Sequence, residues 1–532
     1  MKKYFLPIIT AILIFGCSQG NQNSSTFVPA PDNEVIYHVV QRSFYDSNGD
    51  QHGDLNGLYD KLDYLQDLGI TSILMLPLYQ SPYYHNYFAD SFEEIDPRFG
   101  TMDDYLKLVK EIHRRGMKIY MDMETQYVTE DHLWYKDSYG NLSSPYSDYI
   151  TYDDSAHTKP STIVYDLDGL KGYDGVFKKI TTVNLNSEKV KEYNYKLFSH
   201  WLDPNGDGDF SDGVDGFRLD HMMDDLDKKG RWTNQFESFW KPLILKLKAI
   251  NPKIRIIAEQ ADWASFGDDY LTRADVDWVF AFRIAFAIRD MDKEKLSTMM
   301  DSTFLLTPKG KNQIVFIENH DMPRFATVVG ENPGKLRIGA ALNLLTGGVP
   351  SIYYGQEIGM RGAGGFMKWG MTDANEIPER EAFEWYKSDT GMGMAFWYKD
   401  TGPWWDSTLV KPNDGISYEE QKDDPESLWN FYKKMIQLRR THSTLVNGTY
   451  KPLLNNQDSV FSFIRRDKQK AAVIITNLSS TEKNTIFNLS GTGLTGKPDI
   501  LWGKQLPEEN ANEWKITLPP YAVLVYEVVV KD

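Results

Sequence analysis

Short β-type segments alternate with amphipathic helical stretches along most of this chain, and this alternation limits the possible folds more than any other feature. The expected strands are 35–41, 72–77, 117–122, 214–220, 254–259, 276–281, 313–319 and 350–353. Apolar residues spaced by three and four predict helices at 58–68, 103–115, 188–202, 234–250 and 334–345, with a further helix at 427–442. Eight strand–helix units in one chain predict an α/β fold of the closed (β/α)₈ TIM barrel type.

Two regions interrupt this alternation. Residues 127–186 are rich in Tyr, Ser, Asp and Gly and show no helical period, which favours a functional loop or a small inserted domain. Beyond 443 the pattern changes to short alternating strands with turn residues between them, which predicts an all-β sandwich. The barrel is therefore expected in two parts, 34–126 and 187–442, followed by a C-terminal β-sandwich domain at 443–532.

The first residues have the pattern of an export signal. A basic start, Met1-Lys-Lys, precedes an apolar run too short to span a membrane, so 1–16 is expected to be a signal peptide. Ile14-Phe-Gly-Cys17 resembles a bacterial lipobox, in which cleavage leaves a lipid-modified Cys17 at the start of a polar tether, 17–33. We expect an exported protein anchored to a bacterial membrane by lipid. The alternative is an ordinary signal peptide with an incidental cysteine.

The composition excludes some classes of partner. A net charge of −17 argues against nucleic acid, because phosphate contacts need clustered Lys and Arg. Cys17 is the only cysteine, so an intramolecular disulfide is impossible. Aromatic residues make up 14% of the chain, and they serve either as large core residues or as platforms for sugar rings.

Three acidic residues come at the ends of expected strands, within about a hundred residues of one another. Asp220 ends one strand, Glu259 ends the next, and Asp321 follows a third. In a barrel of this type the carboxyl ends of the strands surround the active site, so three acids there indicate catalysis. Arg218 lies beside Asp220 and favours its ionised form, as a nucleophile needs. Glu259 follows apolar residues, and burial would raise its pKa as a general acid requires.

Two carboxylates with these opposite demands form the arrangement of a glycosidase, and a spacing of about 5 Å would mean retention of configuration. Several motifs strengthen this interpretation. They are Gly216-Phe-Arg-Leu-Asp220, Ala258-Glu259, Phe316-Ile-Glu-Asn-His-Asp321, Tyr45-Asp-Ser-Asn-Gly-Asp50 with Gly53-Asp54, Ile95-Asp-Pro-Arg-Phe-Gly-Thr101 and Ile352-Tyr-Tyr-Gly-Gln-Glu-Ile-Gly-Met360. Together they resemble the signature regions of the α-amylase family, glycoside hydrolase family 13.

The resemblance extends from Val35 to the C-terminus. It implies a catalytic barrel, a B domain inserted after the third strand (127–186) and a C-terminal β domain. By position, it makes Asp220 the nucleophile, Glu259 the acid/base and Asp321 the transition-state stabiliser, with Arg218 and His320 in the same sugar subsite.

The sequence also departs from the family pattern. Family members carry Asp-x-x-x-Asn-His at the third strand, whereas this chain reads Asp122-Met-Glu-Thr-Gln126-Tyr127. The usual Gly-Tyr-Asp is Asn86-Tyr87-Phe88, and the usual Lys-His after the nucleophile is Met223-Asp224. We expect Tyr87, Asp122, Gln126 and Tyr127 to bind substrate in a rebuilt pocket that prefers short α-linked oligosaccharides to insoluble starch. The alternative for Tyr127 and Phe88 is plain loop packing.

Two acidic loops have the pattern of hard-cation sites, with oxygen-bearing residues at alternating positions. The family resemblance supports Ca²⁺ in the first, held by Asp46, Asn48, Asp50, Asp54 and the His52 carbonyl. The second contains Asp203, Asn205, Asp207, Asp209 and Asp212 and begins like an EF-hand loop, but its twelfth position is Val214 in place of Glu. The alternative for the second loop is an acidic turn.

Three functions remain open from the sequence. The leading one is a retaining glycosidase acting on α-glucans or maltooligosaccharides, and the second is a glucan-transferring enzyme of the same family. The third is a non-catalytic, lipid-anchored glucan-binding protein. The presence of Asp220, Glu259 and Asp321 argues against the third, because a binding protein needs no general acid.

Overall fold

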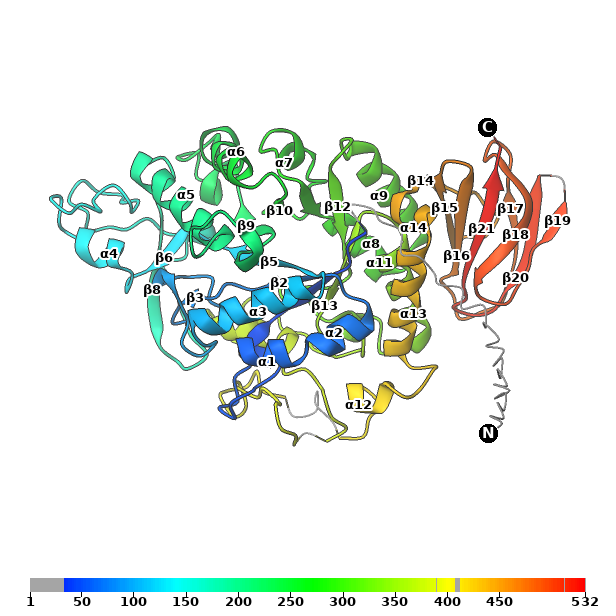
Figure 1. Ribbon diagram of the computed structural model, residues 1–532, viewed down its shortest axis with the longest axis horizontal. Helices are drawn as coiled ribbons and strands as arrows, with labels where there is room; N and C mark the ends of the chain where they lie inside the picture. Colours follow the sequence, from blue (N-terminus) through cyan, green and yellow to red (C-terminus); the bar gives the residue numbers. More distant parts are fainter. Residues whose placement is uncertain (1–32, 389, 407–411, 511, 532) are drawn as a thin grey trace, which may run out of the picture.

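The computed structural model describes residues 33–388, 390–406, 412–510 and 512–531. Eight parallel strands close into a barrel in the order β1-β13-β12-β11-β10-β9-β5-β2 (Figure 1). They are β1 (Ile36–Val39), β2 (Ser72–Met75), β5 (Lys118–Met123), β9 (Gly216–Met222), β10 (Arg255–Gln260), β11 (Trp278–Phe280), β12 (Asn312–Val315) and β13 (Val349–Tyr353). Each falls on a predicted strand, which confirms the TIM barrel.

Helices surround the barrel because each connection between parallel strands carries an apolar face that packs against the sheet. They are α1 (Leu55–Asp60), α2 (Leu62–Leu68), α3 (Met102–Arg114), α5 (Glu188–Leu202), α6 (Lys241–Ile250), α7 (Asp268–Thr272), α8 (Phe282–Asp290), α9 (Lys293–Leu306), α10 (Phe325–Val328), α11 (Pro333–Leu345), α12 (Tyr418–Gln421) and α13 (Leu428–Thr441). The strands β1 and β2 are buried along their whole length, as expected for strands covered on both faces.

Local sequence signals place several helix ends. Thr101 and Asp104 form a reciprocal capping box at the start of α3, and Ser187 caps α5. Two predicted helices are interrupted. The stretch 58–68 is divided at Lys61 between α1 and α2, and 234–250 contains a π-helical turn, Phe236–Trp240, that leads into α6.

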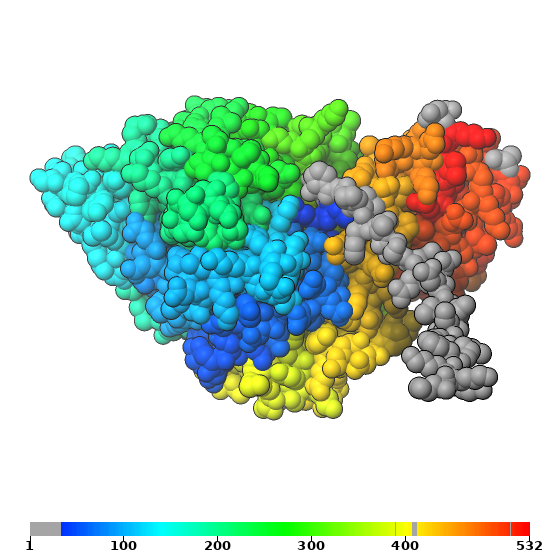
Figure 2. Space-filling view, viewed as in Figure 1, coloured from blue at the N-terminus to red at the C-terminus, as the bar shows by residue number. Residues whose placement is uncertain are grey.

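The segment between β5 and β9 projects from one end of the molecule (Figures 1 and 2). It contains a small sheet in the order β6-β8-β7, formed by β6 (Tyr127–Thr129), β8 (Phe177–Thr182) and β7 (Gly169–Lys171), together with the short helix α4 (Leu133–Ser138). The hairpin β3 (Tyr79–Gln80) and β4 (Ser91–Ile95) lies between β2 and α3 in the chain. The predicted B domain thus falls on a segment with its own sheet.

The C-terminal region is all β and lies at the opposite end of the molecule (Figures 1 and 2). A five-stranded sheet has the order β14-β15-β16-β21-β18 and a three-stranded sheet the order β17-β20-β19. The strands are β14 (Thr449–Pro452), β15 (Val460–Asp467), β16 (Lys470–Asn477), β17 (Lys483–Asn488), β18 (Leu494–Trp502), β19 (Glu508–Asn510), β20 (Glu513–Leu518) and β21 (Val523–Val530). Residues of both sheets, including Val473, Phe487, Trp514 and Tyr526, share one buried cluster.

This domain is joined to the barrel through α14 (Ser443–Asn447) and buried arginines. Arg465 of β15 donates hydrogen bonds to the carbonyls of Gly448 and, at the end of α11, Leu345 (2.7 and 3.2 Å). Arg439 of α13 donates to the carbonyls of Leu344 in α11 and Leu445 in α14 (3.0 and 3.1 Å). The barrel and the sandwich therefore share polar contacts as well as an apolar boundary.

The largest difference from a predicted strand boundary is at β12. The expected strand 313–319 ends at Val315, and side chains of the residues that follow make hydrogen bonds within the loop. The buried Glu318 carboxylate accepts the backbone N–H of Phe325 and a guanidinium N–H of Arg324 (3.1 Å for Arg324). Asn319 accepts the N–H of Asp321 at 3.0 Å. Asp321 therefore lies on a loop beyond β12 and is not at the tip of the strand itself.

The predicted signal peptide, Cys17 and all of the predicted tether except Asn33 lie outside the described residues, and lipid anchoring stays a prediction. Among the helices that the structure describes, none combines the length and apolarity that crossing a bilayer requires.

Candidate active site

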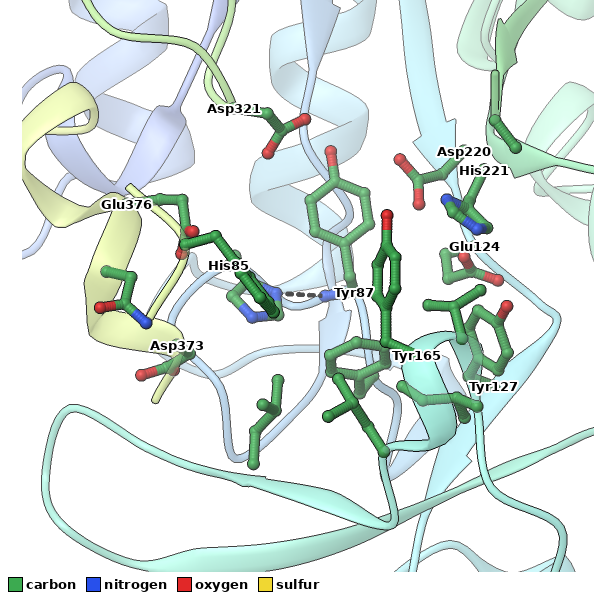
Figure 3. A pocket seen from close by; sticks show the side chains of 18 of the residues that line it. His85, Tyr87, Glu124, Tyr127, Tyr165, Asp220, His221, Asp321, Asp373 and Glu376 are labelled. Atoms are coloured by element: carbon green, nitrogen blue, oxygen red, sulfur yellow. Dashed lines mark hydrogen bonds between the residues drawn. The ribbon is translucent and has the colours of Figure 1, made fainter. Parts of the chain in front are cut away.

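The three predicted acids line one cavity at the carboxyl ends of the barrel strands. Asp220 comes from β9, Glu259 from β10 and Asp321 from the loop after β12, and the cavity has a volume of about 590 Å³. Tyr87 lies between Asp220 and Asp321 (Figure 3). The parallel strands bring these side chains together although more than a hundred residues separate Asp220 from Asp321, as barrel geometry requires.

Arg218 organises the floor beneath this cavity. Its guanidinium is buried, and its Nη1 contacts Asp122 Oδ2 at 2.7 Å and also pairs with Asp220. Its Nη2 contacts Glu259 Oε2 at 2.9 Å. One cation therefore binds three carboxylates, two of which line the cavity. Burying unpaired charges costs several kcal/mol or more. The three acids can therefore be buried in ionised form only because Arg218 pairs with them.

Tyr87 and His320 form a second contact group beside Asp122. The Tyr87 hydroxyl donates a hydrogen bond to Asp122 Oδ2 at 2.7 Å and lies 2.9 Å from His320 Nε2. The two rings stack with centroids 5.5 Å apart. Burial lowers the pKa of His320 well below its ordinary value, and nearby Arg380 and Arg218 lower it further. His320 is therefore neutral at physiological pH and offers hydrogen bonds without a charge.

The two proposed reacting carboxyl groups differ in acidity. Burial raises the pKa of Glu259 to about 7, while Arg218 opposes the shift. Burial also raises the pKa of Asp220, to about 6, against the opposing charge of Arg218. The sequence suggested that Arg218 keeps the pKa of Asp220 low. In the structure the effect of burial is larger than that of Arg218, so the pKa of Asp220 is raised. Near neutral pH the order still leaves Asp220 mostly ionised and Glu259 partly protonated.

Further contacts orient Glu259. Its Oε1 accepts the indole N–H of Trp263 at 3.2 Å, and its Oε2 accepts the backbone N–H of His221 at 3.1 Å. Trp263 in turn stacks on Phe282, with ring centroids 4.7 Å apart. The carboxyl group is thus held from two sides, which fixes where a proton could be delivered.

The predicted substrate-binding residues divide into two groups. Tyr87, Tyr127 and His320 line the cavity, whereas Arg218, Asp122 and Gln126 are not among its lining residues. Gln126 is buried, and its side-chain N–H donates to the backbone carbonyl of Asp220 at 2.8 Å. Tyr127 donates to Asp227 Oδ1 at 2.5 Å. Gln126, which departs from the family pattern, therefore holds the backbone of Asp220 from outside the cavity. Tyr127 forms part of the cavity wall.

Several cavity residues were not predicted. The most important is Arg380, whose Nη2 contacts Asp321 Oδ1 at 2.8 Å and whose Nε donates to the His320 carbonyl at 2.8 Å. It follows a short 3₁₀ segment, Asp373–Glu379, that has neither strand nor helix periodicity, so no local signal marks it. The other unpredicted lining residues include His85, Glu124, Tyr165, His221, Trp263, Phe366, Asp373 and Glu376.

The two predicted cation loops lie away from this cavity. In the first, the Asp46 carboxylate accepts backbone N–H groups of Asn48, Gly49 and Gln51 (2.7–3.1 Å), and Asp54 caps α1 through Gly57. In the second, Asp203 accepts those of Gly206, Asp207 and Gly208 (2.8–3.2 Å).

Over the described ranges, no three His, Cys, Asp or Glu side chains converge on a metal position. A cation in either loop would therefore depend on amide and carbonyl oxygens beside few carboxylates, which Ca²⁺ accepts. Calcium binding stays a prediction.

Comparison with known proteins agrees with the fold. Residues 38–448 match the family model described as the alpha amylase catalytic domain. The chain belongs to the alpha-amylase family. The match covers most of the chain and confirms the predicted α-amylase-type glycosidase.

Individual relatives cover nearly the full length. The chain is 28% identical over 504 residues to alpha-amylase 3 of Dictyoglomus thermophilum, covering 93% of each. It is 27% identical over 569 residues to the oligo-1,6-glucosidase of Parageobacillus thermoglucosidasius, covering 93% of this chain and 98% of the relative. The crystal structure of alpha-amylase from H. orenii superposes with a TM-score of 0.76 at 24% identity, covering 94% of this chain and all of that one, and supports the shared fold.

Proposed function

We propose that this alpha-amylase family enzyme is a retaining glycosidase that cleaves α-glucosidic bonds in short α-glucans or maltooligosaccharides. The observation that carries the proposal is the shared guanidinium of Arg218, which contacts Asp220 and Glu259 through two of its own nitrogens. This holds the two carboxyl groups close together. Retaining glycosidases have a short carboxyl separation, whereas inverting ones leave room for a water between the groups.

The proposed reaction has two steps. In the first, protonated Glu259 gives its proton to the glycosidic oxygen, the bond from that oxygen to the anomeric carbon breaks, and an Asp220 oxygen bonds to that carbon. In the second, water loses a proton to Glu259 and attacks the same carbon, which releases Asp220. Asp321, held by Arg380, would accept hydrogen bonds from sugar hydroxyl groups as charge develops.

The shape of the cavity mouth supports short substrates. Tyr165, from the segment between β5 and β9, and Phe366, from the loop after β13, have ring centroids 5.9 Å apart. Both line the cavity and both are largely exposed, 79% and 69% respectively. Aromatic rings exposed at a cavity mouth offer flat faces for a sugar ring. Their contact also narrows the passage that a polymer would need on both sides of the cleaved bond.

Product analysis tests the proposal against its alternative. The purified protein is incubated with maltotriose, panose, pullulan or soluble starch, and the products are separated by chromatography. Shortened products from the oligosaccharides are expected. The anomer that is released first shows whether the configuration is retained, as proposed, or inverted. Lengthened chains would favour a glucan-transferring enzyme, and no change with any substrate would contradict both.

A further inference from the structure

Glu124 is a buried acid in the cavity that the proposed reaction has not used. It directly follows β5, is 1% exposed and lines the same cavity as Asp220 (Figure 3). Its backbone is fixed by Tyr79, whose hydroxyl donates to the Glu124 carbonyl at 2.7 Å and accepts the Glu124 N–H at 3.1 Å. Its Oε1 accepts the backbone N–H of Gln126 at 2.7 Å. Oε1 of Glu124 therefore acts as a hydrogen-bond acceptor, and Oε2 is the oxygen that can carry a proton.

The other side of Glu124 meets Asp220. In the parallel pairing of β5 with β9, Met123 lies opposite Leu219, so the next residues, Glu124 and Asp220, are neighbours at the strand ends, and both line the cavity. A hydrogen bond between two carboxyl groups requires that one of them carry a proton. Asp220 also pairs with the Arg218 guanidinium, which favours its ionised form. Within the described part of the chain, no Lys, Arg or His side chain pairs with Glu124, so Glu124 is the partner that keeps the proton.

The charges around Glu124 agree with this assignment. The charged groups with the largest effect on Glu124 are Asp220 of β9 and Asp122 of β5. Glu124 in turn raises the pKa of Tyr79 of β3 and of Tyr127 of β6. None of these four groups is a cation. Burial raises the pKa of Glu124 well above its ordinary value, and the Asp220 charge raises it further. Glu124 is therefore protonated at the pH where Asp220 is ionised.

We propose that Glu124 is a positioning residue that donates its carboxyl O–H to Asp220, holds that carboxylate in place for attack and stabilises its ionised form. The proposal rests on the proposed role of Asp220 as the nucleophile. The proton stays on Glu124 throughout, so Glu259 alone transfers protons to and from the substrate. The side-chain N–H of Gln126 donates to the Asp220 carbonyl, so residues 124–126 hold both the backbone and the side chain of Asp220.

Two substitutions of similar size separate donation from mere packing. Glu124→Gln keeps an acceptor for the Gln126 N–H and an N–H donor for Asp220, whereas Glu124→Met keeps the bulk and loses both. We expect kcat of the Met variant to fall about tenfold or more, because hydrogen bonds to charged groups are strong. We also expect the acid limb of its kcat/KM profile to move to higher pH, because Asp220 loses a donor that stabilises its charge. The Gln variant should keep the wild-type acid limb and most of kcat.

A Met variant with the wild-type acid limb, or a Gln variant shifted as far as the Met variant, would overturn the proposal. Infrared titration of the protonated carboxyl band provides a readout independent of activity. At neutral pH, wild type should contain one more protonated carboxyl group than Glu124→Gln, whereas Glu294→Gln, on the exposed face of α9, should show no such loss. An unchanged band in Glu124→Gln would overturn the proposal even if the Met variant does not fold. A wild type inactive on every glucan but with this band difference would refute the proposed function alone.

Discussion

Arg218 places one buried positive charge among Asp122, Asp220 and Glu259. A substitution at any one of these four residues changes the charge balance of the other three. It therefore tests a chemical role only if the new side chain keeps the shape of the old one. Asn and Gln do this, because they keep the volume and several hydrogen bonds of Asp and Glu.

Asp220→Asn and Glu259→Gln should each lower kcat by at least about 10³-fold, because one removes the attacking charge and the other the transferable proton. Hydrolysis of maltotriose measures the loss, and melting curves check that both variants remain folded. Turnover near that of wild type in either variant would refute the assigned role. Asp262→Asn, at another carboxyl group lining the cavity, is the matched control and should keep most activity.

The acidities of the same pair predict a narrow pH optimum. The proposed reaction requires Asp220 to be ionised and Glu259 to be protonated, and their pKa values are raised to about 6 and about 7. We expect kcat/KM to rise with pH through about 6 and to fall as pH increases through about 7. A profile measured at constant ionic strength checks both limbs. Activity that stays constant well above neutral pH would contradict Glu259 as the acid.

At the scale of elements, the first acidic loop has a structural role at the start of α1 and a proposed role in binding a cation. Asp54 accepts the N–H of Gly57 at 2.6 Å and so caps α1, whether or not a cation is bound. Asp50 is more exposed, and its carboxylate accepts only the N–H of His52 among the hydrogen bonds identified. The two carboxylates therefore give different predictions.

Chelation should lower the melting temperature of wild type, and added Ca²⁺ should restore it, because a ligand of the folded state stabilises it by mass action. Asp50→Ala should remove most of this response. Asp54→Ala should lose about 1 kcal/mol of stability even with chelator present, because an N-cap is lost. Differential scanning fluorimetry with and without Ca²⁺ measures both. A wild-type melting curve that is the same with chelator and with Ca²⁺ would argue that the loop is a turn.

The elements also show what the sequence could and could not predict. The position of Asp220 and Glu259 at the cavity could be predicted because each ends an apolar run that becomes a buried strand, and a strand tip has a known place in a barrel. Arg380 was missed because it lies in an aperiodic segment that reaches the site only through the tertiary fold. Glu124 stood inside a recognised departure from the family pattern, but its partner became visible only when β5 and β9 were paired.

At the scale of the whole molecule, the segment between β5 and β9 meets the loop after β13 above the cavity. Tyr165 and Phe366 make this contact, and each belongs to a segment without a predictive period. Their meeting could not be predicted from the sequence, because two hundred residues separate them. We propose that this contact limits which substrates can enter the cavity.

Tyr165→Ala and Phe366→Ala should each raise the ratio of kcat/KM on soluble starch to kcat/KM on maltotriose several-fold, since the passage widens and a stacking face is lost. Tyr139→Ala is a matched control, because Tyr139 is an exposed tyrosine of the same inserted segment that does not line the cavity. An unchanged ratio in both variants would show that these rings do not select substrates.

The pairing of β1 with β13 has a consequence for biosynthesis. Ile36 lies opposite Ser351, so the barrel cannot close until the ribosome has made about two thirds of the chain. Contacts between residues so far apart in sequence form slowly, because a long loop must be ordered first. Until then the buried acids of β5, β9 and β10 remain in water with ordinary acidity. The emerging chain should thus stay open to chaperones, and the raised pKa values of its acids arise only when the last strand docks.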